Sequence, residues 1–92
     1  MSKLSPADSA SRLGALTAWK IESGELTRTF QFGDFSGSLR FVNGVGELAE
    51  KAAHHPDIDI RYNKVRLALV THDAGGLTAK DFDLAAEVDK LV

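Results

Sequence analysis

The lack of cysteine is the feature that most constrains this chain. None of its 92 residues is a cysteine, so no disulfide can cross-link the fold and no thiolate can bind a metal or act as a nucleophile. A chain of this length is near the lower end of the sizes that fold alone, so its stability must come from a compact apolar core. We therefore expect residues 1–92 to form a single domain, helped by self-association.

Composition and charge exclude several classes of protein. Hydrophobic residues make up 43% and charged residues 26% of the chain, which is typical of a globular domain and not of a disordered one. The net charge is −2 and the basic residues are spread out, so no basic surface for nucleic acid is expected. No apolar run approaches the roughly 20 residues that span a bilayer, and residues 1–5 lack the apolar core of a signal peptide. We expect a cytoplasmic protein without membrane or nucleic-acid partners.

The first half of the chain reads as a helix, a hairpin and a second helix. Ser5 and Pro6 fit the cap and first position of a helix that runs to about Leu16. Alternating apolar and polar residues predict strands over 19–22 and 26–32, joined by a Ser-Gly turn. From residue 35 to 53 the apolar period becomes helical. Three glycines in this stretch oppose a helix by up to about 1 kcal/mol each, so the alternatives are a broken helix or glycines that allow another element to approach closely.

The second half reads as a second hairpin and a third helix. Pro56 ends the preceding helix, because the residue before a proline is pushed out of the helical region. Alternation predicts strands over 58–62 and 65–71 with a turn at Asn63. Thr78, with an acid three residues later, resembles a capping box. The apolar face of the helix that follows should comprise five residues: Leu84, Ala85, Val88, Leu91 and Val92.

The order of these elements, α-β-β-α-β-β-α, predicts the fold class. Hairpins imply an antiparallel sheet, and helices must bury their apolar stripes against it. We expect an α+β two-layer domain in which a four-stranded antiparallel sheet carries three helices on one face. The other face or an edge of the sheet, and the glycine-bearing second helix, are the surfaces where a second copy would pair.

Three histidines are the candidates for chemistry. His54 and His55 lie between the second helix and the third strand, and His72 follows the fourth strand. If the last two strands pair, these segments meet at one edge of the sheet. Imidazoles there suit acid–base catalysis, because histidine can give and take a proton near neutral pH. The alternatives are structural or surface histidines and a three-histidine metal site, which adjacent side chains disfavour because they diverge in an extended chain.

Asp81 and the large aromatic residues also have two interpretations each. Asp81 either caps the last helix, which its spacing favours, or it orients a histidine or holds a polar group of a ligand. Trp19 and Tyr62 are expected in the core rather than at a ligand. Glu50 and Lys51 are expected on a solvated helix face.

Motifs in the last half of the chain resemble one protein family, that of pterin-4a-carbinolamine dehydratase. They are EKAAHHPD at 50–57, YNKV at 62–65 and THDAGGLTAKD at 71–81. Their order and spacing follow the family, whereas the first half is similar mainly in element order, around Trp19 and in its phenylalanine-rich strand. The departures are Ile58 where an aromatic residue is common, Asp73 in place of glutamate, and Ala74. None of these removes a proposed proton carrier, although Ile58 would change the pocket wall.

The resemblance implies a function and a set of site residues. Family members are lyases that dehydrate 4a-hydroxytetrahydropterin, left after an aromatic amino acid hydroxylase uses its pterin, to quinonoid dihydropterin and water. This step recycles a tetrahydrobiopterin-type cofactor and needs neither a metal nor an organic cofactor. The family's catalytic histidines match His54, His55 and His72, and its acid matches Asp81. With Asp81, we expect Pro56 and Thr71 to contact the substrate.

The resemblance also implies assemblies of two or four copies and a functional link to an aromatic amino acid hydroxylase. Two other functions stay open from the sequence. One is a non-catalytic pterin-binding or protein-interaction module of the same fold, against which the three intact histidines argue. The other is a metal-dependent hydrolase.

Overall fold

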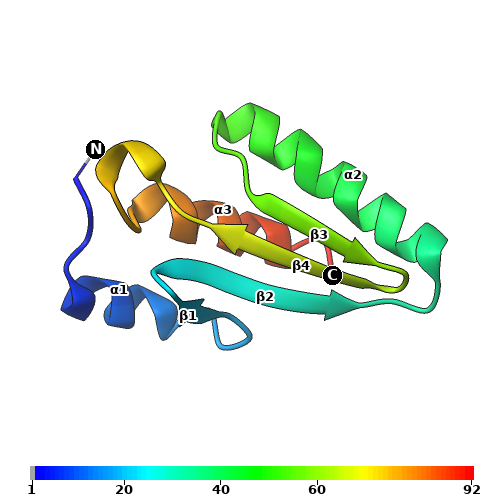
Figure 1. The fold of residues 1–92 in the computed structure, drawn as a ribbon, viewed down its shortest axis with the longest axis horizontal. Helices are drawn as coiled ribbons and strands as arrows, with labels where there is room; N and C mark the ends of the chain where they lie inside the picture. The colour runs from blue at the N-terminus through cyan, green and yellow to red at the C-terminus, as the bar shows by residue number, and fades with distance from the viewer. Residues whose placement is uncertain (1) are drawn as a thin grey trace.

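The computed structural model describes residues 2–92 and contains two hairpins and three α-helices. The order is α1 (Pro6–Leu13), β1 (Lys20–Glu22), β2 (Glu25–Gln31), α2 (Phe35–Ala52), β3 (Asp57–Arg61), β4 (Lys64–Leu69), the short 3-10 helix η1 (His72–Ala74) and α3 (Ala79–Asp89). This is the predicted α-β-β-α-β-β-α order (Figure 1). No helix of the described chain is long and apolar enough to cross a membrane.

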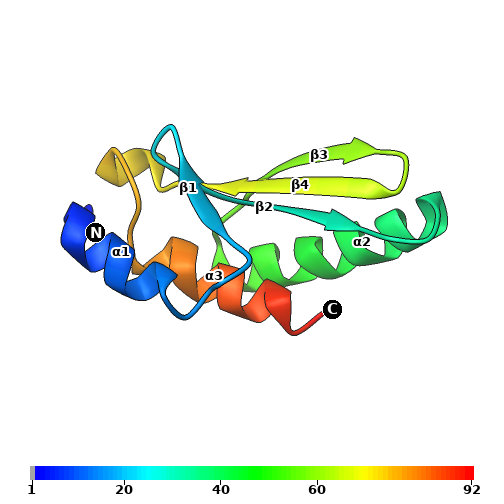
Figure 2. The same cartoon turned by 90° about the horizontal axis from the view of Figure 1, so that it is seen from below.

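The four strands form one antiparallel sheet in the order β1-β2-β4-β3. All three helices lie on one side of it, as Figure 2 shows, so the predicted α+β two-layer architecture is confirmed. The β1–β2 turn consists of Ser23 and Gly24, both with positive φ, which is the two-residue turn that matches the twist of a hairpin. The β3 strand is an edge strand and pairs only with β4 among the described strands.

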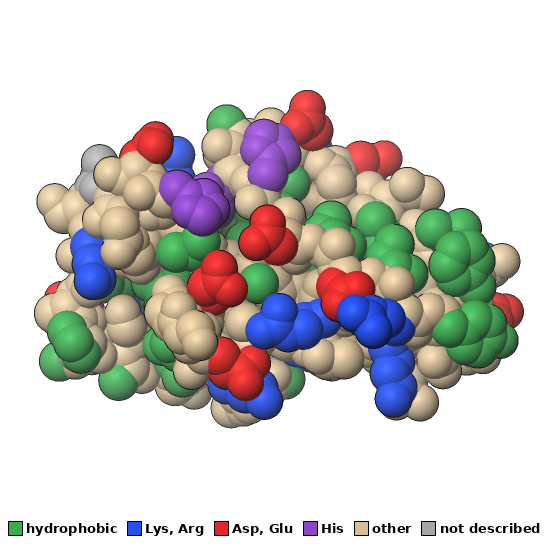
Figure 3. Space-filling model, viewed as in Figure 1, with side chains coloured by type: hydrophobic (Ala, Val, Ile, Leu, Met, Phe, Trp, Pro, Cys, Tyr) green, Lys and Arg blue, Asp and Glu red, His purple; other side chains and the backbone are tan. Residues whose placement is uncertain are grey.

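The open face of the sheet is polar. Glu22 accepts hydrogen bonds from the Thr27 hydroxyl and from Arg66 and lies 3.5 Å from Lys20 Nζ. The Thr27 hydrogen bond, with smaller effects of Lys20 and Arg66, lowers the pKa of Glu22, although burial of the carboxyl group opposes this shift. Figure 3 shows acidic and basic side chains spread over this face, with histidines at one end. The face therefore offers charge to a partner rather than a continuous apolar surface.

The core lies between the sheet and α2 and α3. It holds Leu26, Val65, Leu67 and Leu69 from the strands, all without exposed surface. Val45, Ala85 and Val88 of the helices are equally buried, and the rings of Phe30 and Phe41 pack at a centroid distance of 4.4 Å. Burial of a side chain of this size contributes about 1.5–3 kcal/mol, which is how a short chain without disulfides can be stabilised.

The α2 helix is continuous through its three glycines. A Cβ on Gly37 would lie 3.1 Å from Phe32 Cβ, and one on Gly44 would lie 3.1 Å from Leu91 Cδ1. Two of the glycines therefore allow the close approach that the sequence suggested as an alternative to a broken helix. Asp34 caps the helix by accepting a hydrogen bond from the Gly37 N–H.

The α2 helix ends in a Schellman motif rather than directly at Pro56. Ala53 adopts the left-handed conformation with φ 50°. The N–H of His54 donates to the Ala49 carbonyl, and the N–H of Ala53 donates to the Glu50 carbonyl. This turn sets the direction in which His54 and His55 leave the helix.

Asp89 fixes the far end of α3. One of its carboxylate oxygens accepts a hydrogen bond from the Trp19 indole at 2.8 Å and an ion-paired one from Arg28 at 2.7 Å. Trp19 is buried as predicted.

Three details of the sequence prediction were wrong. Tyr62, expected in the core, is 65% exposed in the β3–β4 turn, where its φ is 52°. Leu91 and Val92 are exposed because α3 ends at Asp89. The first helix ends at Leu13, and Leu16 reaches the core from the turn that follows.

Ala53 provides a test of the α2 terminus. A left-handed φ brings Cβ close to the carbonyl oxygen, a cost that glycine avoids. We expect Ala53→Gly to raise the free energy of unfolding by about 1 kcal/mol, measured by urea denaturation. Ala52→Gly is the matched control in right-handed helix and should lower it, because glycine disfavours helix. Lower stability of both variants would contradict the Schellman turn at Ala53.

Candidate active site

The predicted meeting of the histidine segments is present. In the β3–β4 register Asp57 pairs with Ala68, so the segment before β3 runs beside the segment after β4. A pocket of about 300 Å³ opens there. It is lined by Ala53, His54, His55, Val70, Thr71, His72, Asp73 and Lys80. Elements far apart in sequence therefore place three imidazoles around one space.

His54 is held by a buried carboxylate. Its Nε2 lies 2.5 Å from Asp81 Oδ1, and the two side chains are 11% and 0% exposed. A carboxylate only accepts hydrogen bonds, so Nε2 is the donor in this pair. The Nδ1 atom has no hydrogen-bond partner among residues 2–92. This arrangement fixes both the orientation and the tautomer of His54.

Asp81 both caps α3 and binds His54, two of the roles that the sequence left open. Its Oδ2 accepts hydrogen bonds from the Thr78 N–H and the Thr71 hydroxyl, each at 2.9 Å. The first of these completes the capping box that begins α3. Among the described residues, no buried side-chain N or O atom lacks a hydrogen-bond partner, so this cluster is fully satisfied.

Of the two other residues expected to contact the substrate, Thr71 lines the pocket and Pro56 does not. Thr71 lines the pocket, but its hydroxyl bonds to Asp81 and lies 2.8 Å from the Thr78 hydroxyl. Its backbone also pairs with Gly76, which closes the loop that carries His72. Pro56 is not among the lining residues.

His55 and His72 are more exposed than His54. His55 Nε2 lies 2.5 Å from Glu50 Oε2, and both side chains face water. Glu50, expected only on a solvated face, is thus the partner of His55, which the chain reversal at Ala53 brings back over the last turn of α2. The His72 side chain has no hydrogen-bond partner among residues 2–92 and is exposed at the mouth of the pocket.

Lys80 is a site residue that the sequence analysis missed. It lines the pocket from the first turn of α3, next to Asp81. The capping-box spacing predicted this turn, and Lys80 could have been found from it. It brings a positive charge to the pocket, which the acidic Asp73 also lines.

The described residues contain no group of three histidine, aspartate or glutamate side chains that could hold a metal ion. His54 and His55 instead pair with two different carboxylates. The arrangement is therefore suited to proton transfer by imidazoles that carboxylates orient.

Comparison with known proteins identifies the family of this chain. The family model described as pterin 4 alpha carbinolamine dehydratase matches residues 2–91. The chain belongs to this family. A relative from Acidobacterium capsulatum, named "Putative pterin-4-alpha-carbinolamine dehydratase", is 58% identical over the full length of both chains. One of the same name from Chloroflexus aurantiacus is 54% identical over 100% of this chain and 99% of its own.

Solved structures of the pterin dehydratase fold agree with this assignment. A crystal structure of a transcriptional coactivator/pterin dehydratase from Brucella melitensis superposes with a TM-score of 0.94, at 32% identity over 98% of each chain. A pterin dehydratase-like protein described as a RuBisCO assembly factor in the alpha-carboxysome gives a TM-score of 0.69, at 25% identity over 80% of this chain and 88% of its own.

The Thr71 hydroxyl gives a test of the Asp81 cluster. Thr71→Val removes a donor from a buried carboxylate oxygen, so we expect the free energy of unfolding to fall by about 1–3 kcal/mol, measured by chemical denaturation. Thr29→Val is the matched control on an exposed strand position and should change it by less than about 0.5 kcal/mol. Equal effects of the two changes would contradict the assigned role of Thr71.

Proposed function

We propose that this protein is a hydro-lyase that dehydrates 4a-hydroxytetrahydropterin to quinonoid dihydropterin and water. The observation that supports this most directly is the convergence of His54, His55 and His72 on one pocket. Membership of the pterin dehydratase family supports the pterin as substrate.

The reaction needs only proton transfers. The bond between carbon 4a and its hydroxyl oxygen breaks, and a proton delivered to that oxygen lets it leave as water. The proton on N5 is removed, and the electron pair of the N–H bond forms the double bond between N5 and carbon 4a. No electron is gained or lost, so general acid–base catalysis by side chains is sufficient.

His54 and His72 are the proposed acid and base, in either order. Both line the pocket and come from different segments, one before β3 and one after β4. His54 works through Nδ1, since Asp81 occupies Nε2. The imidazole of His72 is not tied to a protein partner in the described chain and can approach the ring. Each correctly placed group contributes on the order of a hundredfold or more.

His55 and Asp81 have supporting roles in this proposal. His55, paired with Glu50 at the rim, positions the hydroxyl or the ring and shares acid–base duty. Asp81 is a positioning residue, because both of its oxygens are occupied by protein donors.

The proposed reaction also implies a functional partner and a location for the protein. Its substrate is what an aromatic amino acid hydroxylase leaves, so we infer a functional link to such an enzyme and a cytoplasmic location. Self-association into two or four copies stays a prediction.

A non-catalytic module of the same fold is the second candidate. The relative described as a RuBisCO assembly factor favours it, since that description assigns an assembly role to a pterin dehydratase-like protein. Pterin binding without turnover by this chain would identify it as such a module.

The two proposed proton carriers can be tested singly. We expect His54→Ala and His72→Ala each to lower the rate of carbinolamine dehydration by about a hundredfold or more, measured in a stopped assay with purified protein. Lys64→Ala, at the opposite end of β4, is the control and should retain full activity. Rates near that of the unmodified protein in both histidine variants would refute the mechanism.

A further inference from the structure

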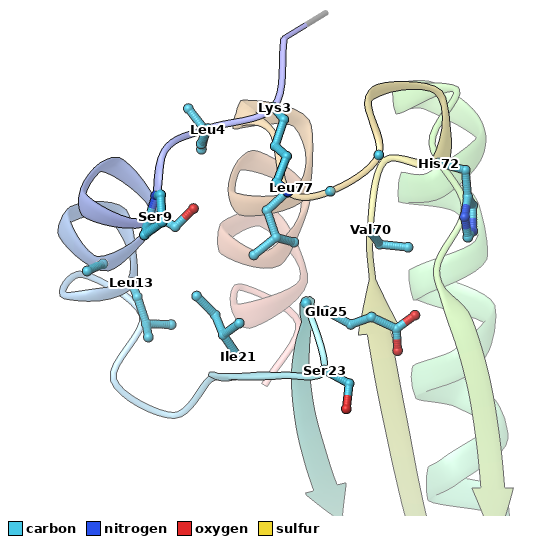
Figure 4. Close-up of a pocket in the computed structure, with 15 residues that line it drawn as sticks. Lys3, Leu4, Ser9, Leu13, Ile21, Ser23, Glu25, Val70, His72 and Leu77 are labelled. Carbon is cyan, nitrogen blue, oxygen red and sulfur yellow. The ribbon is translucent and has the colours of Figure 1, made fainter.

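A second and larger cleft lies beside the histidine pocket. Its volume is about 660 Å³, and it lies between α1, the β1–β2 turn and the segment 70–77 (Figure 4). Leu13, Ile21 and Leu77 point toward one another across it, and Leu4 and Val70 add to its apolar lining. Clefts of this size and character are typical of sites for small molecules.

The cleft leaves apolar side chains in contact with water. Ile21 is 38% exposed although its β-sheet partner Leu26 is fully buried. Covering such surface would stabilise the bound state of any ligand that lies against it. Polar groups lie around this apolar lining: Ser23 and Glu25 at the β1–β2 turn, Ser9 in α1, Lys3 before α1 and His72 after β4.

The two sites share part of their walls. Val70 and His72 line both the histidine pocket and the larger cleft. A ligand whose reacting atoms touch His72 therefore lies at the junction of the two spaces. A group that extends from those atoms across the shared wall at Val70 and His72 enters the apolar cleft.

The chemistry of the pterin places such a group there, and this step rests on the proposed function. N5, which loses its proton, is bonded to C6, the carbon at which a pterin carries its side chain. Carbon 4a, which loses the hydroxyl, is bonded to N5. Whichever of the two groups His72 serves, the C6 side chain begins next to it.

We propose that this cleft binds the C6 side chain of the pterin and that the protein selects pterins whose C6 side chain has a large apolar body. The histidine pocket alone, at about 300 Å³, is left to the ring. The larger cleft then determines which pterin binds best, without contributing a group to proton transfer.

The test compares two stable ligands that differ only at C6, 6-methyl-7,8-dihydropterin and 6-phenyl-7,8-dihydropterin. We expect the unmodified protein to bind the phenyl compound about tenfold more tightly, measured by titration calorimetry or fluorescence. Equal affinities would overturn the proposal.

Ile21 and Ile58 form a matched pair for mutation. Both are in edge strands, and they are 38% and 39% exposed, but only Ile21 lines the cleft. Ile58, which the sequence analysis expected in the pocket wall, is not among the residues that line the histidine pocket. Ile21→Asp should abolish the preference for the phenyl compound and leave the affinity for the methyl compound within about twofold, whereas Ile58→Asp should retain the preference. A preference retained in Ile21→Asp, or lost in both variants, would contradict the proposal.

A second variant covers the case in which Ile21→Asp does not fold. Ala10→Phe fills the cleft from α1 and should also remove the preference, while Ser11→Phe, which does not line the cleft, should keep it. If the cleft variants change the molecular mass in solution and not the ligand preference, a second copy covers the cleft and the proposal fails.

The outcomes separate this inference from the proposed function. Turnover of the 6-methyl carbinolamine without any preference for the phenyl compound leaves the dehydratase function in place and overturns the inference alone. A lack of both binding and turnover with either compound overturns the two together.

Discussion

The buried carboxylate of Asp81 is the interaction on which the site depends. It accepts hydrogen bonds from the N-cap residue of α3, from Thr71 after β4 and from His54 before β3. An ionised carboxylate without these donors would be costly to bury. The cluster therefore forms completely or is destabilising, and when it forms it joins three chain segments at one point. The position of His54 follows from the fold of the whole second half of the chain.

Much of this arrangement could be predicted from the sequence. The two alternating segments with a turn at Asn63 predict a hairpin, and antiparallel pairing alone brings His54 and His72 to the same edge. The three-residue spacing from Thr78 to Asp81 predicts the capping box. These predictions succeed because they depend on local patterns, which the tertiary structure here does not override.

Other features depend on tertiary contacts that no local pattern reports. From the sequence, capping of α3 and binding of a histidine were alternative roles for Asp81. The structure combines them, because each of the two carboxylate oxygens serves one role. The Glu50–His55 pair depends on the left-handed conformation of Ala53. The sequence does not predict this conformation, because alanine rarely adopts it. The large cleft is lined by residues from 3–25 and 70–77, two stretches that only the tertiary structure brings together.

The α3 helix is fixed at both ends by carboxylates, Asp81 at its start and Asp89 at its end. The length of the helix therefore sets the distance between the histidine pocket, where Asp81 binds His54, and the far end, where Asp89 binds Trp19 and Arg28. Inserting or deleting one residue would rotate one end relative to the other by about 100°, so only one of the two carboxylates could stay in place. The length of this helix is therefore part of the specification of the site, in contrast to surface turns, whose lengths can vary more freely.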